Sequence, residues 1–327
     1  GDLGDLGPPR GEGGGMPVGE PGASGALAAL DALARFTRPH TMLGTAVSVG
    51  SVSLVALQGA ASEAAPALVL LGFGQALASA LLMNVAIVGV NQCFDVPLDR
   101  INKPYLPLAS GEFSMAQGVA ISVGTALASL LLGAWSGSRA LMATIGGSLV
   151  LGIAYSADLP GLRWKRHPVV AAACIMAVRS FFVHIGFFSH MRAALGLPFQ
   201  WSRSLVFTIA FMFLFALVIA FFKDMPDVKG DREIGIRTLS VRVGVGTVFK
   251  VGMGLLLAAY AGGFVMGVTS PVAWSRFVTA AAHAGMAWVL LRQARSVDLE
   301  SSDSIYSFYL FIWKLFYAEY LLLPFIR

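Results

Sequence analysis

The chain has 327 residues, of which 56% are hydrophobic and only 13% are charged, with a formal net charge of +5. Soluble domains carry about 25% charged residues, so an aqueous fold of this composition would expose large apolar patches, and an integral membrane protein is favoured. The two cysteines, Cys93 and Cys174, are isolated and give neither a disulfide framework nor a zinc-binding spacing.

Residues 1–27 are rich in Gly and Pro, which predicts a disordered leader, and they lack the compact apolar run of a secretory signal. Residues 28–327 are predicted to form one transmembrane domain, because apolar stretches of about 20 residues recur to the end of the chain. The candidate spans lie near residues 29–57, 67–92, 115–134, 139–157, 168–189, 203–222, 247–268, 272–292 and 305–325. We therefore expect an all-α integral membrane protein with about nine transmembrane helices. The first stretch is overlong and begins in a polar run, so part of it is expected in the membrane interface.

The connections between these spans are of two kinds. Those after the second, fourth and sixth spans are long and charged, whereas those after the first, third, fifth and seventh are short or poor in charge. The positive-inside rule places the charged side, and the N-terminus with it, towards the compartment of synthesis. An active site on that side is a second explanation of the same asymmetry, and the two are compatible.

The second span ends in an acidic motif at residues 91–99. Asn91, Asp95 and Asp99 are spaced i, i+4 and i+8, so they share one face while the helix continues, and Pro97 is expected to loosen its last turn. Oxygen ligands in such a row suit a hard divalent cation such as Mg²⁺, which binds carboxylates together with phosphate oxygens and water.

A second acidic motif follows the sixth span. Asp224, Asp227 and Asp231 are spaced i, i+3 and i+7, which predicts another shared helix face. A single acidic helix end is usually a solvated loop, but two on one membrane side repel each other unless a cation or basic groups neutralise them. The pair of motifs therefore predicts a metal site.

Basic residues accompany both motifs. Lys103 and Lys223 are adjacent to the aspartates in sequence, and the connection after the fourth span contains Tyr155, Lys165 and Arg166. Arg binds a diphosphate by bidentate contacts and Lys as a point charge. Arg163 in the same connection is explained equally well as part of a positive-inside cluster.

At these motifs the chain resembles the UbiA superfamily of intramembrane aromatic prenyltransferases. The two motifs have the forms NxxxDxxxD and DxxDxxxD, and the resemblance covers nearly all of residues 29–327. It implies a helical bundle around a central cavity and a Mg²⁺-dependent transfer of a prenyl group from its diphosphate to an aromatic ring.

Longer stretches, at residues 35–41, 102–112, 162–166 and 311–320, look like the plastid homogentisate prenyltransferases. Residues 270–271 and 296–299 resemble the phytyltransferase branch, whereas residues 192–201 resemble the solanesyltransferase branch of plastoquinone synthesis. More of the chain, including both ends, favours the phytyl branch. The implied reaction joins phytyl diphosphate to homogentisate with loss of CO₂, giving 2-methyl-6-phytyl-1,4-benzoquinol for tocopherol synthesis. The implied location is a chloroplast membrane, the inner envelope in particular.

The resemblance also implies roles for individual residues, in three groups. The Mg²⁺ ligands would be Asn91, Asp95, Asp99, Asp224, Asp227 and Asp231, of which Asp95, Asp99, Asp224 and Asp227 are the catalytic set. The diphosphate contacts would be Asn91, Lys103, Tyr155, Lys165, Arg166 and Lys223. The homogentisate carboxylate requires a cation deeper in the pocket, for which Arg38, His40 and Arg179 are the candidates. An internal ion pair, or a bond to helix carbonyls, explains Arg179 equally well.

The remaining histidines of the fifth span, His184 and His190, are expected to pack and are assigned no role. The expected partners are the two substrates and the lipid bilayer, and not nucleic acid. A cation-coupled transporter is the rival of a different class, but its ligands would lie near the membrane midplane and not at helix ends beside basic loops. A purely structural membrane subunit leaves both acidic motifs unexplained.

Overall fold

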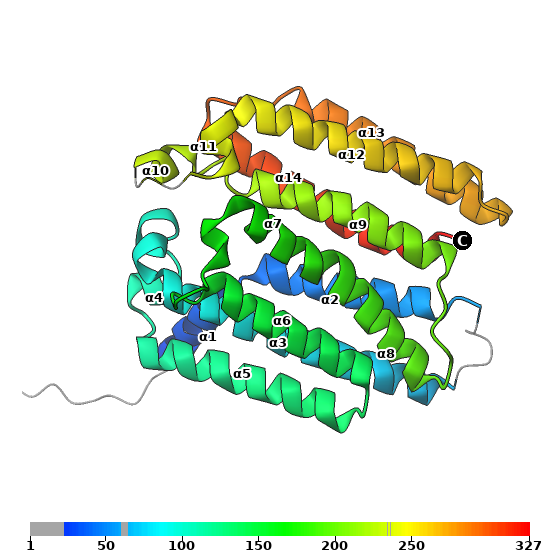
Figure 1. Ribbon diagram of the computed structural model, residues 1–327, viewed down its shortest axis with the longest axis horizontal. Coiled ribbons are helices and arrows are strands. Elements are labelled where there is room, and N and C mark those ends of the chain that lie inside the picture. The colour runs from blue at the N-terminus through cyan, green and yellow to red at the C-terminus, as the bar shows by residue number, and fades with distance from the viewer. Residues whose placement is uncertain (1–22, 60–64, 234, 236) are drawn as a thin grey trace, which may run out of the picture.

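The computed structural model describes residues 23–59, 65–233, 235 and 237–327, and all regular structure within these ranges is helical. The long helices lie side by side along one direction and form a bundle (Figure 1). Their bounds are α1 Ala23–Thr37, α2 Pro39–Ala56, α3 Pro66–Asn102, α5 Met115–Trp135, α6 Arg139–Ser156, α7 Pro168–Met176, α8 Phe187–Ala194, α9 Arg203–Phe222, α12 Val245–Val268, α13 Ala273–Ala294 and α14 Ser302–Leu322. Shorter helices are α4 Pro107–Ser110, α10 Val228–Glu233 and α11 Leu239–Val243. The all-α prediction is confirmed.

Within the described residues, seven helical segments are long and apolar enough to cross a membrane: Pro66–Asn102, Met115–Trp135, Arg139–Ser156, Val169–Ala194, Arg203–Phe222, Val245–Val268 and Ser302–Phe325. The helices α2 and α13 have 18 and 22 residues but are less apolar, and α13 contains Arg276, His283 and Arg292. Nine spans therefore stays a prediction.

The first predicted span is two helices. Arg38 interrupts it with a left-handed backbone (φ 52°, ψ 81°) between α1 and α2. The ring of Pro39 disfavours helical geometry at the preceding residue, which explains the break at this point. Arg35 attaches α1 to the segment before α5, because its guanidinium donates to both carboxylate oxygens of Glu112, at 2.9 and 2.5 Å. Residues 1–22 of the expected leader lie outside the described residues, and residues 23–27 already belong to α1.

The two acidic motifs differ in local structure. The first is helical throughout, because α3 continues past Pro97 to Asn102, so its three polar residues lie on one helix as predicted. The second is not on one helix: α9 ends at Phe222, Asp224 and Asp227 lie in a turn, and Asp231 lies in α10. The shared helix face predicted for the second motif is therefore wrong. Pro226 explains the difference, since it has no N–H to donate and restricts the residue before it.

The fifth span contains a π-helix, Ala177–Gly186 (η2), between α7 and α8. Such segments are rare and often lie near functional sites. Arg179 lies in this segment.

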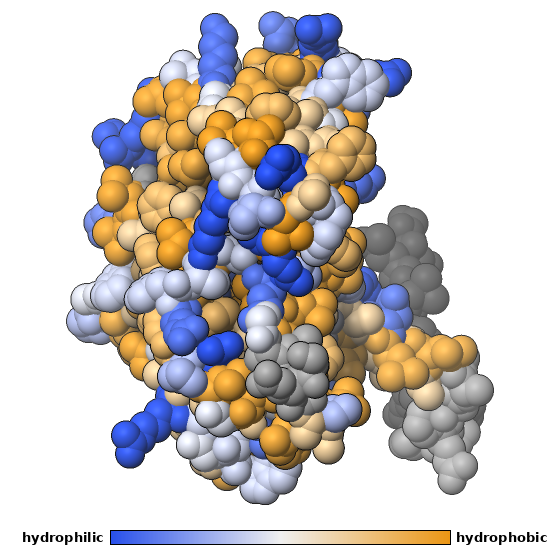
Figure 2. Space-filling model, turned by 90° about the vertical axis from the view of Figure 1, so that its right-hand side faces the viewer, coloured by the Kyte–Doolittle hydropathy of each residue, from blue (hydrophilic) through white to orange (hydrophobic). Residues whose placement is uncertain are grey.

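The outer sides of the bundle are apolar. Leu131, Val150 and Phe277 are 70%, 65% and 76% exposed, as expected of side chains that face lipid. Figure 2 shows the end of the bundle opposite the acidic motifs, with hydrophobic residues over much of its surface. The motifs lie at the other end, where α4, α10 and α11 cap the long helices (Figure 1).

Candidate functional site

A cavity of about 1520 Å³ runs into the bundle from the end that carries the acidic motifs. All predicted site residues but one line it: Arg38, His40, Asn91, Asp95, Lys103, Tyr155, Lys165, Arg166, Arg179, Lys223, Asp224, Asp227 and Asp231. The exception is Asp99, which is buried on α3 with the Lys103 ammonium 4.0 Å from its carboxylate. The fold thus gathers residues that are up to about 190 positions apart in sequence.

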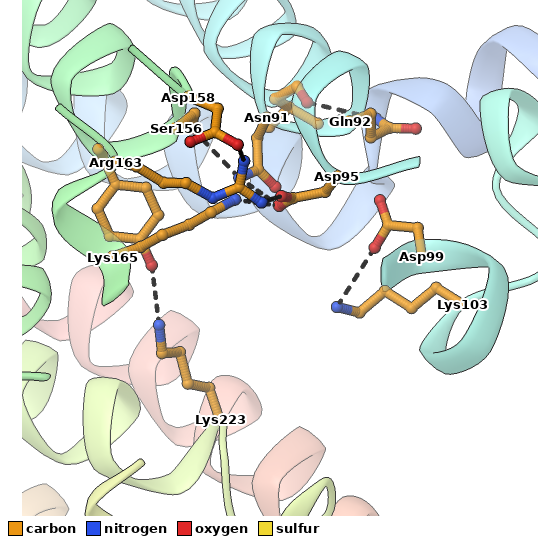
Figure 3. A network of polar contacts seen from close by, with 12 residues as sticks. Asn91, Gln92, Asp95, Asp99, Lys103, Ser156, Asp158, Arg163, Lys165 and Lys223 are labelled. Atoms are coloured by element: carbon orange, nitrogen blue, oxygen red, sulfur yellow. Dashed lines mark hydrogen bonds and ion pairs between the residues drawn. The ribbon is translucent and has the colours of Figure 1, made fainter. Parts of the chain in front are cut away.

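Asp95 is the centre of the network at the first motif (Figure 3). Lys165 forms an ion pair with its carboxylate, and Arg163 Nη2 lies 3.5 Å from Oδ1. The Asn91 amide donates to Asp95 Oδ2 at 3.1 Å and to the Ser156 hydroxyl at 3.2 Å. The lysine and arginine therefore neutralise Asp95.

Arg163 belongs to the site more directly than the sequence predicted. It has a left-handed backbone (φ 59°), lines the cavity and bridges Asp95 to Asp158, whose carboxylate is 2.8 Å from Nη1. Its sequence signal is its place two residues before Lys165 in the stretch that resembles the plastid enzymes. The positive-inside explanation alone does not account for a side chain only 16% exposed.

The second motif faces this network through Lys223 and Tyr155. The Lys223 ammonium donates to the Tyr155 hydroxyl at 2.9 Å and lies 3.9 Å from the Asp224 carboxylate. Burial opposes its charge, but Tyr155 and Asp224 outweigh burial and raise the pKa of Lys223. A firmly charged ammonium therefore lies between α6 and the second motif.

The carboxylates of the second motif have too few positively charged partners to neutralise them. Burial raises the pKa of Asp224 and of Asp227, and burial with repulsion from both raises the pKa of Asp231 to about 6. Among the described residues, Asp227 and Asp231 form no ion pair. A divalent cation would supply the missing charge, so this donor set fits Mg²⁺.

No three His, Cys, Asp or Glu side chains in the described part of the chain are close enough to bind one metal ion together. Mg²⁺ does not need such a cage, because it is usually held by one or two carboxylates together with water and substrate phosphates. The arrangement fits a Mg²⁺ ion to which each motif contributes some ligands and a diphosphate contributes the others.

Arg179 lies deeper, where α14 contributes aromatic rings to the cavity. Its guanidinium is over the ring of Trp313 at 4.9 Å and that of Phe316 at 5.8 Å. Among the described residues, Arg179 forms no ion pair and no side-chain hydrogen bond, so neither the internal ion pair nor the bond to helix carbonyls is formed. An unpaired cation beside a cavity can bind an anionic group.

The candidates of the first helix pair reach the same aromatic residues. The ring of His40 meets that of Trp313 edge to face at 5.6 Å, and the Tyr317 hydroxyl donates to the His40 carbonyl at 2.7 Å. Arg38 lines the cavity at the break between α1 and α2. Trp313 was missed by sequence reasoning, although it lies in the 311–320 stretch.

Two histidines without an assigned role are packing residues. The His184 ring bonds to the Ser180 carbonyl at 2.9 Å and to the Tyr320 hydroxyl at 3.0 Å. His190 bonds to the Gly72 carbonyl at 2.9 Å. Both are buried, so the expectation for them is met.

Comparison with known proteins identifies relatives over most of the chain. Residues 47–315 match the UbiA prenyltransferase family. Homogentisate phytyltransferase 1, chloroplastic, from Arabidopsis thaliana is 48% identical over 299 residues, which are 91% of this chain and 76% of that protein. Homogentisate geranylgeranyltransferase from Triticum aestivum is 46% identical over 91% of this chain and 73% of its own length.

A solved structure shows the same fold. A UbiA homologue from Archaeoglobus fulgidus, bound to GPP and Mg²⁺, aligns with a TM-score of 0.60 over 90% of this chain and 99% of its own, at 18% identity. At that identity the similarity establishes the arrangement of helices and not the roles of side chains.

Proposed function

The chain belongs to the UbiA prenyltransferase family, and we propose that it transfers a phytyl group from phytyl diphosphate to homogentisate with loss of CO₂, giving 2-methyl-6-phytyl-1,4-benzoquinol. It is a membrane-embedded prenyltransferase. The proposal for the two substrates is supported by the relative that is named for this reaction at 48% identity.

One observation carries the proposal: a single cavity joins an end rich in carboxylates and lysines to an inner wall with an unpaired arginine. A diphosphate suits the first part, and an acid-bearing aromatic ring suits the second. Between them the walls are mostly apolar, with Met83, Ile87 and Leu217 among the lining residues, which suits a prenyl chain.

At the polar end we assign the diphosphate to Lys103, Lys165, Arg166 and Lys223. When bound, Mg²⁺ would neutralise the leaving diphosphate, with Asn91, Asp95, Asp99, Asp224, Asp227 and Asp231 as its proposed ligands. Lys165 forms an ion pair with Asp95 at this end, so its ammonium lies beside the position proposed for the diphosphate. Cations placed where negative charge develops favour breaking of the C–O bond. Tyr155 fixes Lys223 for this task.

At the inner wall we assign the homogentisate carboxylate to Arg179, with Arg38 and His40 beside it. Trp313 lies against both Arg179 and His40. An aromatic acid bound there would contact the Trp313 ring face to face or edge to face, while its carboxylate pairs with the Arg179 guanidinium. A site held this way orients the ring carbon towards the allylic carbon of the tail. The apolar walls exclude water, which would otherwise capture the allylic cation.

The cellular location is proposed as a chloroplast membrane, and the inner envelope in particular. The support is the chloroplastic name of the Arabidopsis relative and the apolar outer sides of the bundle. Fractionation of isolated chloroplasts, with immunodetection in envelope and thylakoid membranes, tests both statements. Enrichment in thylakoids would overturn the inner-envelope assignment.

A competition assay tests the reaction. Purified protein in detergent receives labelled homogentisate, Mg²⁺ and equal concentrations of phytyl and solanesyl diphosphates, and the products are identified by mass. We expect the phytyl product. Solanesyl product alone would support the plastoquinone branch, which residues 192–201 resemble. Turnover without a membrane gradient also separates an enzyme from a coupled transporter.

The acceptor assignment has its own test. Arg179→Gln should raise the KM for homogentisate more than the KM for phytyl diphosphate, by roughly 10- to 100-fold for the loss of a charged hydrogen-bond partner. Arg139→Gln, at an exposed position on the opposite end, is the matched control. Equal KM values in wild type and Arg179→Gln would remove Arg179 from the acceptor site.

A further inference from the structure

The cavity ends inside the bundle on the side away from the aspartates. On four of the helices that line the cavity, the last lining residue inward from the polar end is Ser48 on α2, Ala80 on α3, Thr144 on α6 and Phe187 at the start of α8; on α9 and α14 it is Leu217 and Tyr320. Ser48, Ala80, Thr144 and Phe187 are all buried, at 3 to 6% exposure. The inner end of the cavity therefore lies within the protein.

One turn further along the same helices, four residues close the space. Val52, Ala76, Leu141 and Met191 are at most 1% exposed and belong to one packed apolar cluster; we call these four residues the floor. They come from α2, α3, α6 and α8, which are four separate walls of the cavity. The floor is therefore a junction of four helices and not one mobile side chain.

Contacts between α3 and α8 hold the floor in place. His190, next to Met191 on α8, bonds at 2.9 Å to the carbonyl of Gly72, which lies one turn beyond Ala76 on α3. Gly72 has no side chain, and the Met191 sulfur is 3.4 Å from the position a Cβ would take there. The helices approach so closely at this point that no chain can pass between them.

The depth of the cavity follows from the helix rise. Ala80 and Asp95 lie on the same helix α3, fifteen residues apart, which is about 22 Å at 1.5 Å per residue. The diphosphate occupies the first part of this length beside the aspartates. Less than about 22 Å therefore remains for the tail.

Prenyl tails differ strongly in length. An extended carbon chain advances roughly 1.25 Å per bond, because bonds of about 1.5 Å zigzag at tetrahedral angles. A four-isoprene tail, such as phytyl or geranylgeranyl, is therefore about 19 Å long, and a nine-isoprene solanesyl tail about 45 Å. The second length exceeds even the bilayer core of about 30 Å. The shorter tail matches the distance between the aspartates and the floor, and the longer tail is about twice that distance.

We infer that the floor sets the chain-length specificity of this enzyme at four isoprene units and rejects longer tails. The inference rests on the proposed transfer from a prenyl diphosphate, and it adds the residues that limit the length of the tail. Ala80 and Phe187 bound the last turn of the cavity, and Met191 closes it from below. Phytyl and geranylgeranyl tails have the same length, so the floor does not separate them.

The test is a chain-length profile in one competition, with diphosphates of three, four, five and nine isoprene units, homogentisate and Mg²⁺. Wild type should use the four-isoprene substrates at least about tenfold better than solanesyl diphosphate, by product ratio. Ala80→Phe fills the last turn, so the three- to four-isoprene ratio should rise about tenfold. Met191→Ala opens the floor, so the five- to four-isoprene ratio should rise. Val150→Phe, a lipid-facing position of α6 that is 65% exposed, is the control and should leave the profile unchanged.

Two results would overturn the inference while leaving prenyl transfer intact. One is efficient use of solanesyl diphosphate by wild type, which would mean that long tails leave the cavity sideways. The other is an unchanged profile in Met191→Ala or Ala80→Phe protein that still turns over. The wild-type profile needs no variant to fold. If homogentisate is not prenylated at all, the proposed function fails, and the floor is tested by thermal stabilisation of the Mg²⁺-treated protein by each diphosphate.

Discussion

Replacing Asp95 by Asn separates the chemical role of this carboxylate from its structural one. The side chain is 7% exposed and pairs with Lys165, which is 14% exposed, and with Arg163. Removal of its charge weakens two charge-assisted contacts, each worth about 1.5–3 kcal/mol when shielded from water. An amide oxygen at this position still accepts one of them. We therefore expect a loss of stability of about 1–3 kcal/mol, which the fold tolerates.

The expected loss of activity is larger. A carboxylate that holds the cation opposite the leaving group acts where charge develops, and removal of such a group costs about 10²–10³ in kcat, or roughly 2.7–4 kcal/mol. The assay is turnover of phytyl diphosphate and homogentisate in detergent, with thermal unfolding followed on the same sample. The Asp95→Ala variant should lose more activity and more stability than Asp95→Asn.

Asp158→Asn is the matched control for the ion-pair network. Asp158 also pairs with Arg163, at 2.8 Å, but it is 50% exposed and does not line the cavity. Its replacement should change activity by no more than a few-fold. If Asp95→Asn keeps more than about a tenth of wild-type kcat, or if both variants lose activity equally, the carboxylate is not a metal ligand and the network has only a structural role.

Four further outcomes are expected. Asp227→Ala should abolish turnover in a protein that still inserts and folds, and activity retained there and in Asp95→Ala would remove the metal–diphosphate assignment. EDTA should stop the reaction and added Mg²⁺ restore it; activity that survives EDTA would exclude a dissociable divalent cation. Arg38→Ala should weaken use of homogentisate more than binding of the prenyl diphosphate, and unchanged acceptor kinetics would count against its role. Because burial and neighbouring carboxylates raise the pKa of Asp231 to about 6, Mg²⁺ must displace a proton below that pH, so its affinity, measured by titration calorimetry, should fall by up to about tenfold per pH unit; a constant affinity from pH 5 to 7 would contradict this.

Patterns that are local along the chain were predictable from sequence. The composition and the long apolar stretches determine an all-α membrane protein, because lipid leaves the backbone no other way to satisfy its hydrogen bonds in isolated spans. The spacing of Asn91, Asp95 and Asp99 determines a shared helix face, since helix geometry is fixed at 3.6 residues per turn. Local irregularities were harder to predict from sequence. The break at Arg38 precedes Pro39, and the turn after α9 contains Pro226, but the effect of each proline depends on where the neighbouring helices end.

Only the tertiary structure decided which distant residues meet. No spacing rule relates Arg163 to Asp95, or Trp313 to Arg179, because the distance between side chains on different helices depends on how the helices pack. The depth of the cavity is a property of the same kind. Asp95 and Ala80 measure it along one helix, but it ends where α2, α3, α6 and α8 converge at Met191 and its three neighbours. The sequence therefore determined a membrane prenyltransferase with two acidic motifs, and packing decided which side chains line its cavity and how deep that cavity is.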